Sequence, residues 1–275
     1  MTTSHPIPIE LEKGAFTRAG TTIHYWVAGE PDAPTVVCTH GVTIDHGTFD
    51  EQIPALVAAG YRAIVWDLRG HGLSRPAGEP ISYLNAAADL AMLLDETAVD
   101  RAMLVGQSFG GMIVQEFCRH HADRAAGLVL VGSPLLGDQL PWPHHWLQRA
   151  RPLLLRLWPE GHLRRITPQF MSQYRGVQLY VAKAIQPLAK EDFVQVTKAA
   201  LEVFLHARPL PDSDMPILLV RGEDEMAMLT QMMERRAALK PHVQLAVVPD
   251  AGHLVNQDNP ATFNEVLLTF LSTVL

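Results

Sequence analysis

The stretch AMLVGQSFGGMIVQEFC, residues 102–118, places one serine between two glycines. An apolar run typical of a buried strand comes before Ser108, and a helical pattern follows it. A turn this tight leaves no room for side chains two positions before or after the serine, and Gly106 and Gly110 remove that conflict, with Gly111 adding space. The pattern predicts a nucleophile elbow, in which the serine projects from the sheet edge at a helix N-terminus, where backbone N–H groups favour a developing anion.

Similar apolar runs recur on both sides of this stretch and alternate with helical patterns. Each run is expected to be a strand covered on both faces, and the runs lie at 35–41, 62–68, 102–107, 127–133, 216–223 and 243–252. The segments FTRAG and TTIHYWVAG, residues 16–29, indicate an opening antiparallel hairpin. Helical patterns lie at 49–60, 86–98 and 261–275. This alternation predicts an α/β fold with a mostly parallel central sheet flanked by helices.

Residues 134–212 interrupt the alternation, because they contain helical segments and several prolines but no convincing strand. We therefore expect a core formed by residues 1–133 and 213–275, with a helical cap, or lid, inserted after the sixth strand. Ten Lys or Arg against six Asp or Glu give this interval a charge of +4 and leave −11 on the remainder. That excess indicates either a solvated helical surface or arginines that meet anionic substrates. Three tryptophans occur in the interval: Trp142, Trp146 and Trp158.

The composition limits the function classes. The 275 residues, 48% hydrophobic and 19% charged, are enough for one domain with an insertion. A net charge of −7 argues against a nucleic-acid partner. The chain shows no signal-peptide pattern and no apolar run near the roughly 20 residues that span a bilayer, so we expect a cytoplasmic protein with a small-molecule substrate and no membrane partner. Cys38 and Cys118 are expected to be buried apolar residues and not a disulfide framework.

A serine hydroxyl is a poor nucleophile at neutral pH, so it needs a base, and the base needs an orienting acid. The stretch PDAGHLVNQDNP, residues 249–260, places His253 after the last apolar run and before the final helix, as in a catalytic loop. Three acidic residues, Glu223, Asp224 and Glu225, follow the preceding strand. The residue pattern alone leaves the choice among these three carboxylates open.

With these residues in place, the chain resembles the α/β-hydrolase fold family, in particular its compact esterase, haloperoxidase-like and epoxide-hydrolase-like branch. The stretch THGVTIDHGTFD, residues 39–50, resembles the family's H-G-x-x segment, and WDLRGHGLSRP, residues 66–76, resembles its D-x-R-G-x-G-x-S turn. The order of Ser108, acid and His253 is the family order. The resemblance covers nearly the whole chain and is weakest over residues 134–212, where the family carries a variable helical cap.

The resemblance implies roles for further residues. It places the acid three residues after Gly222, at Glu225, where most members have Asp, with Asp224 as the competitor. It implies an oxyanion hole formed by the backbone N–H groups of Val42 and Phe109, although Thr43 stands where relatives often have proline. Structural roles are implied for His40, Asp67, Arg69 and His71, and Asp45 and His46 are candidates for the border of the pocket.

The expected activity is hydrolysis of small to medium carboxylic esters through an acyl-enzyme, with no metal and no organic cofactor. A serine in place of a carboxylate nucleophile argues against epoxide hydrolysis or dehalogenation, which proceed in this fold through an alkyl-enzyme ester. A lactonase, a thioesterase, a C–C bond hydrolase and a haloperoxidase- or perhydrolase-like enzyme remain alternatives, as do a non-catalytic ligand receptor and a structural partner-binding protein. The tryptophans of the insertion are interpreted as walls of an apolar substrate pocket. The sequence leaves the oligomeric state open.

Overall fold

The computed structural model describes residues 10–137, 153–206, 208–211 and 213–275. Within these residues, eight strands form one sheet with the order β1-β2-β4-β3-β5-β6-β7-β8. Their bounds are β1 Glu12–Arg18, β2 Thr21–Ala28, β3 Thr35–Thr39, β4 Arg62–Trp66, β5 Ala102–Gln107, β6 Ala125–Val131, β7 Ile217–Gly222 and β8 Val243–Val248. Strand β2 is antiparallel to β1 and β4, and the remaining neighbours are parallel. The predicted hairpin and mostly parallel sheet are therefore confirmed.

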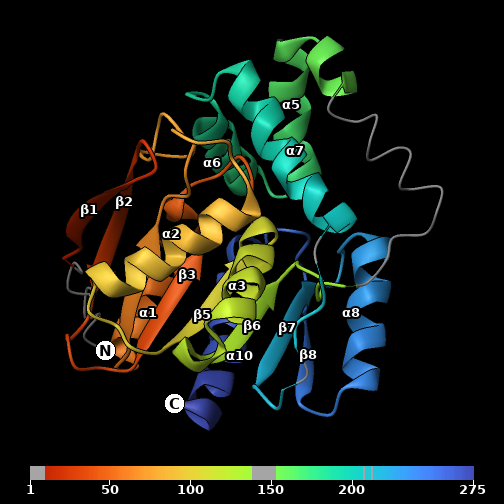
Figure 1. Cartoon of the computed structure of the whole chain (residues 1–275). Helices are drawn as coiled ribbons and strands as arrows, with labels where there is room; N and C mark the ends of the chain where they lie inside the picture. The colour runs from red at the N-terminus through yellow and green to blue at the C-terminus, as the bar shows by residue number, and fades with distance from the viewer. Residues whose placement is uncertain (1–9, 138–152, 207, 212) are drawn as a thin grey trace, which may run out of the picture.

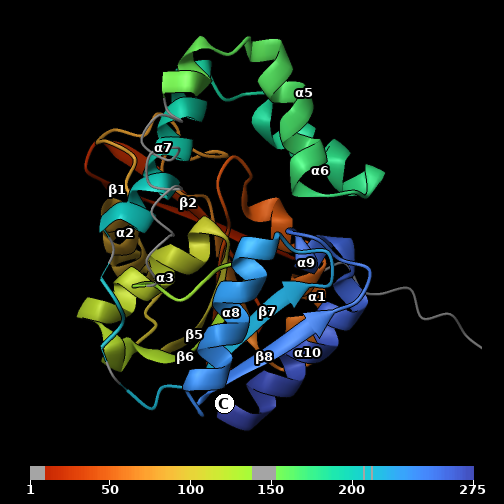
Figure 2. The ribbon, with the colours of Figure 1, turned by 90° about the vertical axis from the view of Figure 1, so that its right-hand side faces the viewer.

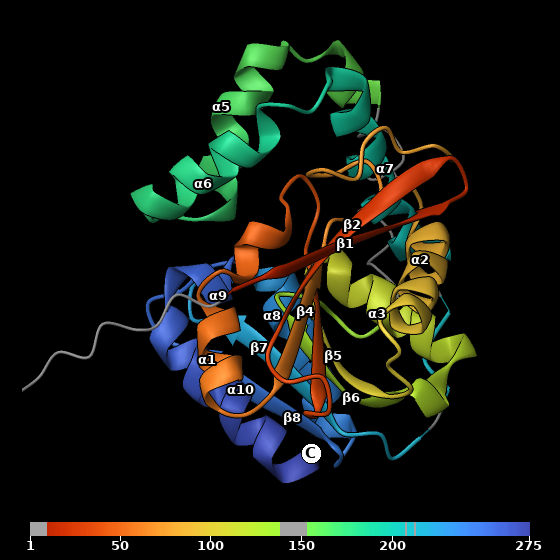
Figure 3. The ribbon, with the colours of Figure 1, turned by 90° about the vertical axis from the view of Figure 1, so that its left-hand side faces the viewer.

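Helices cover both faces of the sheet (Figures 1, 2 and 3). One face carries α1 (Gln52–Ala58) and α10 (Pro260–Val274), and the other carries α2 (Tyr83–Glu96), α3 (Phe109–His120) and α8 (Ala227–Leu239). Shorter helical turns lie in the loops: η1 His46–Phe49, η2 Ala122–Arg124 and α9 Val255–Asp258. Because side chains alternate across a strand, each central strand contributes to both apolar layers, as Val37 and Cys38 of β3 do.

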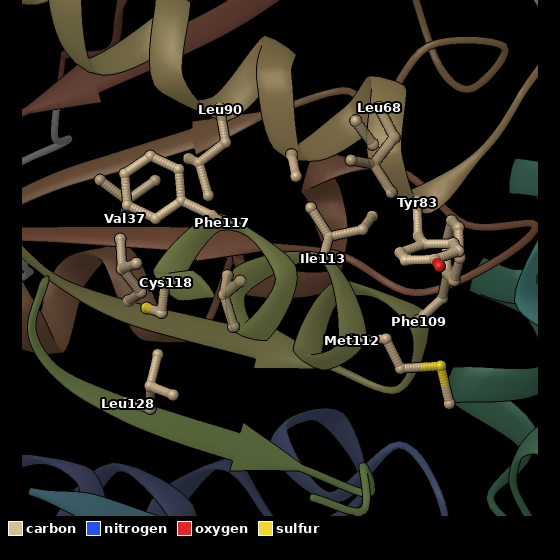
Figure 4. Packing of buried hydrophobic residues seen from close by; sticks show 14 of the residues in the cluster. Val37, Leu68, Tyr83, Leu90, Phe109, Met112, Ile113, Phe117, Cys118 and Leu128 are labelled. Atoms are coloured by element: carbon tan, nitrogen blue, oxygen red, sulfur yellow. The ribbon is translucent and has the colours of Figure 1, made fainter. Parts of the chain in front are cut away.

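The apolar cluster between the sheet and helices α2 and α3 extends from the buried core to residues that line a cavity. Figure 4 shows Leu90 and Phe117 at one end of this cluster and Phe109 and Met112 at the other. Strand β8 differs from the expectation of coverage on both faces, because it is the edge of the sheet and Val247 is 45% exposed. Both cysteines are free and buried, as the composition indicates.

In the described part of the chain between β6 and β7 lie helices α5 (Glu160–Met171), α6 (Arg175–Ile185) and α7 (Lys190–His206). They lie beyond the carboxyl ends of the parallel strands (Figures 1 and 2). An apolar cluster joins them to the core, with Ile44 and Leu254 packed against side chains of α5 and α6. No strand occurs in the described part of residues 134–212. The division of the chain into core and cap units stays a prediction.

The turn after β4 is held by buried ion pairs. Arg69 donates to both carboxylate oxygens of Asp89 over 2.6 and 2.7 Å, and Arg18 donates to the same carboxylate over 2.8 Å. The side chains of Arg69 and Asp89 are inaccessible to solvent, so removing Asp89 would leave the buried charge of Arg69 without an ionic partner. This geometry agrees with a structural role for Arg69.

Across the described residues, no helix combines the length and apolar character needed to cross a membrane.

Candidate active site

Ser108 stands in the turn between β5 and α3. Its φ angle is +51°, a region that non-glycine residues rarely adopt and that costs about 1–3 kcal/mol. A Cβ on Gly106 would lie 2.5 Å from the backbone of Gly111, and a Cβ on Gly110 would overlap the carbonyl oxygen of Thr39. The two glycines of the predicted elbow are therefore required by close backbone contacts. They allow the chain to turn sharply enough to expose the Ser108 side chain.

The structure brings His253 and Glu225 to this serine. The Nε2 atom of His253 lies 3.1 Å from the Ser108 Oγ, and its Nδ1 lies 3.1 and 3.2 Å from the two oxygens of Glu225. Gly132, at φ +54°, makes room beside this pair, because a Cβ there would lie 3.0 Å from a Glu225 oxygen and from the His253 carbonyl. Gln107 donates its side-chain amide to that same carbonyl over 3.3 Å. The side chains of Ser108, His253 and Glu225 thus form a continuous hydrogen-bonded chain.

The other two acidic residues of the loop after β7 point elsewhere. The Asp224 carboxylate accepts a hydrogen bond from the side chain of Gln173 at 2.9 Å, and that of Glu223 accepts the backbone N–H of Asp250 at 3.4 Å. The longer Glu225 side chain reaches the imidazole, and one of its oxygens also accepts the N–H of Met226 at 2.9 Å. The geometry therefore favours Glu225 over Asp224 as the orienting acid.

The pKa shifts of His253 and Glu225 are those expected of a base and the ionised carboxylate that orients it. Burial works to lower the pKa of His253, but the charge and hydrogen bonds of Glu225 outweigh it, together with the charge of Asp258, and the pKa is raised from the ordinary value. Burial works to raise the pKa of Glu225, yet the neighbouring imidazole and the N–H of Met226 lower it overall. Glu225 is therefore ionised at neutral pH and stabilises the protonated imidazole.

The two residues expected to form the oxyanion hole lie beside the serine. Val42 and Phe109 line the same cavity as Ser108 and His253. Phe109 is the first residue of α3, so its N–H is one of those that a helix leaves without an intrahelical acceptor. Thr43, next to Val42, has a φ of +63°, a conformation in which a β-branched residue is strained. The use of these two N–H groups to bind an oxyanion stays a prediction.

Two buried histidines behind this loop are held neutral. The Nε2 of His40 accepts the backbone N–H of Leu68 at 3.0 Å, and its Nδ1 lies 2.7 Å from the carbonyl of Gly41. Burial lowers the pKa of His40 to about 4 and that of His71 to about 3. Both rings support the loops by hydrogen bonding, since the Nδ1 of His71 lies 3.1 Å from the Arg69 carbonyl. The implied structural roles agree with this geometry.

Asp45 and His46 were candidates for the border of the pocket, but neither is among its lining residues. The ring of His46 stacks on Trp26 with centroids 3.5 Å apart, and its Nδ1 lies 2.8 Å from Asp67. The carboxylate of Asp45 accepts the hydroxyl of Tyr180 at 2.9 Å and so joins α6 to the core. Asp67 also accepts the N–H of Leu73 over 2.7 Å, as a turn-building residue does.

A cavity of about 410 Å³ opens above Ser108 and His253. Helices α5 and α7 and the start of α8 form its walls, and Phe170 lines it while being 62% exposed, which places this side chain at the mouth. Among the described residues, the lining includes no Asp, Glu, Lys or Arg. Its apolar residues are Val42, Phe109, Met112, Pro134, Leu155, Leu163, Ile166, Phe170, Met171, Phe193, Ala200, Leu201, Met226, Met228 and Leu229.

The apolar pocket is built differently from the sequence interpretation. Trp158 is not among its lining residues, is 44% exposed and lies against His162, with ring centroids 5.7 Å apart. Trp142 and Trp146 lie outside the described residues. Methionines, phenylalanines and leucines supply the walls instead. The alternative of arginines that meet anionic substrates gains no support, because no arginine is among the described lining residues.

Some functional candidates were missed by sequence reasoning. Gly132 gave no signal, because its role depends on two loops that reach it from distant parts of the chain. Asp258 lies within the quoted His253 stretch, and its position five residues after the histidine could have drawn attention. Ser172, whose hydroxyl donates a hydrogen bond to Asp258, had no signal of its own. Among the described residues, no cluster of His, Cys, Asp or Glu has the arrangement of a metal site.

A profile of the alpha/beta hydrolase family matches residues 36–266. The chain therefore belongs to the alpha/beta hydrolase family. Epoxide hydrolase A of Mycobacterium tuberculosis is 39% identical over 119 residues, which cover 42% of this chain and 37% of that protein. The match thus spans little more than a third of that relative.

Other relatives match over nearly their whole length. The 3-oxoadipate enol-lactonase 1 of Acinetobacter baylyi is 25% identical over 267 residues, or 94% of this chain and 96% of that protein. The solved structure of a thermophilic esterase from Thermogutta terrifontis has a TM-score of 0.78 at 24% identity, covering 96% of this chain and 99% of that one. At this identity the likeness shows the shared fold.

Proposed function

We propose that this protein is a serine hydrolase that cleaves small to medium carboxylic esters through an acyl-enzyme on Ser108. The observation that carries the proposal is the hydrogen-bonded chain from Ser108 through His253 to Glu225 at the floor of an apolar cavity. A nucleophile, a base and an orienting acid in contact are the parts that acyl transfer needs. A serine in the elbow also argues against epoxide hydrolysis, for which this fold uses a carboxylate nucleophile.

The reaction follows from the positions of these groups. His253 Nε2 takes the proton of the Ser108 hydroxyl as the oxygen attacks the ester carbonyl, and the N–H groups of Val42 and Phe109 stabilise the negative oxygen. The carbonyl re-forms, the alcohol leaves with the proton from His253, and the acyl group stays on Ser108. Water then attacks the acyl-enzyme with His253 again as base, and His253 returns the proton to the Ser108 oxygen as the acid is released. Glu225 holds the imidazole and stabilises its charge in both steps.

The cavity favours uncharged, apolar substrates. Its three threonine hydroxyls are already used, since Thr167 and Thr197 donate to carbonyls in their own helices over 2.8 Å and Thr43 donates to Val42 over 2.7 Å. A substrate carboxylate would therefore lose its hydration without gaining a hydroxyl donor from these threonines. The volume of about 410 Å³ suits a ligand of modest size. A lactone is a cyclic ester, and the full-length similarity to an enol-lactonase makes lactones the second candidate substrate.

The direct test is labelling by a fluorophosphonate together with hydrolysis of p-nitrophenyl esters. We expect the wild-type protein to be labelled and Ser108→Ala to lose both labelling and most of the roughly 10⁶-fold acceleration typical of such triads. Ser213→Ala is the matched control, because Ser213 is exposed and is not among the residues that line the cavity. Labelling that persists in Ser108→Ala would contradict the proposal, and an unlabelled wild-type protein would favour a ligand receptor.

A substrate panel tests the apolar pocket. We expect turnover to be higher with butyrate or hexanoate esters than with acetate, and low with esters that carry a carboxylate. Lactones, thioesters and peroxide-dependent halogenation belong in the same panel, because the same triad can support them. Activity that falls steadily from the shortest acyl chain, or turnover of charged esters alone, would exclude an apolar acyl site.

A further inference from the structure

The turn between α5 and α6, residues 172–174, lies against the two loops that carry Glu225 and His253. Each of its residues donates a side-chain hydrogen bond to one of those loops or to α9, the short helix that follows His253. The bonds are Ser172 Oγ to Asp258 Oδ1 (2.5 Å), Gln173 Nε2 to Asp224 Oδ2 (2.9 Å) and the Tyr174 hydroxyl to the Asp250 carbonyl (2.7 Å). Because Met171, just before this turn, lines the cavity, one short segment contacts both the substrate site and the candidate base loop.

The Ser172 contact is the most direct of the three. Asp258 ends α9, and its second oxygen accepts the backbone N–H of Gly252 at 2.9 Å. Gly252 immediately precedes His253, so a continuous path leads from the insertion to the backbone that carries the imidazole. The serine is only 4% exposed, and its hydroxyl oxygen accepts the N–H of Tyr174 at 3.0 Å. Two hydrogen bonds therefore fix the hydroxyl that meets Asp258.

The charges that face the imidazole come from two elements. Glu225 approaches from the loop after β7, and Asp258 approaches from α9, while the elbow after β5 presents the neutral Ser108. Burial raises the pKa of Asp258, and the hydrogen bonds from Ser172 and Gly252 and the charge of His253 counteract this. Removing the Ser172 hydroxyl would thus leave a partly buried carboxylate with one donor fewer, which it can relieve by turning away from Gly252 or by binding a proton.

We propose that Ser172 and Asp258 are positioning residues for His253. The Ser172 hydroxyl holds the Asp258 carboxylate, which fixes the Gly252 amide and thereby directs the imidazole toward Ser108. This inference rests on the proposed function, since it assigns the two residues to the same base. It gives the helical insertion a second role: it shapes the pocket and also sets the alignment of the proton-transfer group.

The test compares Ser172→Ala, Ser172→Thr and Asp258→Asn in steady-state hydrolysis of p-nitrophenyl butyrate. A small misplacement of a catalytic group can cost up to about 10²-fold, so we expect kcat of Ser172→Ala to fall by about 10-fold with little change in KM. Ser172→Thr keeps the hydroxyl and should restore kcat. Asp258→Asn removes a negative charge that faces the imidazolium, so the acid limb of its kcat/KM profile should move to lower pH.

Gln173→Ala is the matched control, because it removes a contact from the same turn to the exposed Asp224. Its kcat and pH profile should equal those of the wild type. If Ser172→Ala loses thermal stability but keeps kcat and its pH profile, the contact is purely structural and the positioning role is wrong. Equal losses in Ser172→Ala and Gln173→Ala would also overturn it.

An NMR titration of the His253 ring separates this inference from the proposed function. The Asp258→Asn variant should show a lower pKa for His253 than the wild type, and this readout needs no turnover. If no ester is hydrolysed and Ser108 is not labelled, the proposed function fails, while the ring titration still reports whether Asp258 faces the imidazole. An unchanged His253 ring spectrum in both Ser172→Ala and Asp258→Asn would contradict the positioning role by itself.

Discussion

The strand-end loops and the helices between β6 and β7 meet at one cavity but contribute different chemistry. The loops after β5, β7 and β8 supply Ser108, Glu225 and His253, three polar side chains in direct contact. Helices α5 and α7 supply mainly apolar walls, and their threonine hydroxyls are used within their own helices. Under the proposed function, bond cleavage would depend mainly on the strand-end loops and substrate choice mainly on the helices, with the contact of Ser172 to Asp258 as the link between them. Substitutions in the two regions should therefore change different kinetic constants.

The largest expected effect tests the loop side of this comparison. Glu225→Gln removes the negative charge that stabilises the imidazolium and disturbs the tautomer of His253, so kcat should fall by about 10⁴-fold. Asp224→Asn should stay within about 2-fold of the wild type, because surface substitutions away from such contacts have small effects. Steady-state hydrolysis of p-nitrophenyl butyrate measures both. Equal losses in the two variants would leave Glu225 without support as the acid.

A smaller effect is expected from a charge placed in the insertion. Ile166 lines the cavity from α5, and Ile166→Lys should lower kcat/KM for apolar esters by about 10-fold while raising it for esters that carry a carboxylate. Trp158→Ala serves as the control and should leave both values unchanged, since Trp158 is outside the cavity lining. A comparable loss of kcat with every ester, charged or not, would break the separation between the two regions.

The smallest effect concerns the pH dependence of the wild type. His253 must be neutral to accept the serine proton, and its pKa is raised above the ordinary 6.5 by Glu225 and Asp258 against the effect of burial. The kcat/KM for ester hydrolysis should therefore rise with pH through a limb centred above 6.5. In Glu225→Gln, a limb measured on the residual activity should lie at lower pH. A wild-type limb below 6.5 would mean that burial dominates in the free enzyme.

Much of the fold followed from local patterns. The apolar runs located the strands, although five of them end earlier than expected: β3 at Thr39, β4 at Trp66, β6 at Val131, β7 at Gly222 and β8 at Val248. The polar and glycine residues that follow these strands belong to the loops that form the site. The edge position of β8 was not predictable from its composition, because an apolar run can form either an edge strand or a central strand of a sheet.

The sequence by itself determined the elbow and the residue types of the candidate site. Gly106, Ser108 and Gly110 are neighbours in the chain, so short-range backbone sterics are enough to require a sharp turn there. Only the tertiary structure decided that Glu225 and not Asp224 contacts His253, that Trp158 lies outside the cavity, and that Ser172 meets Asp258. These outcomes depend on how distant loops and helices pack together. Where the backbone turns, neighbouring residues of the same chemical type, such as Asp224 and Glu225, direct their side chains to different partners.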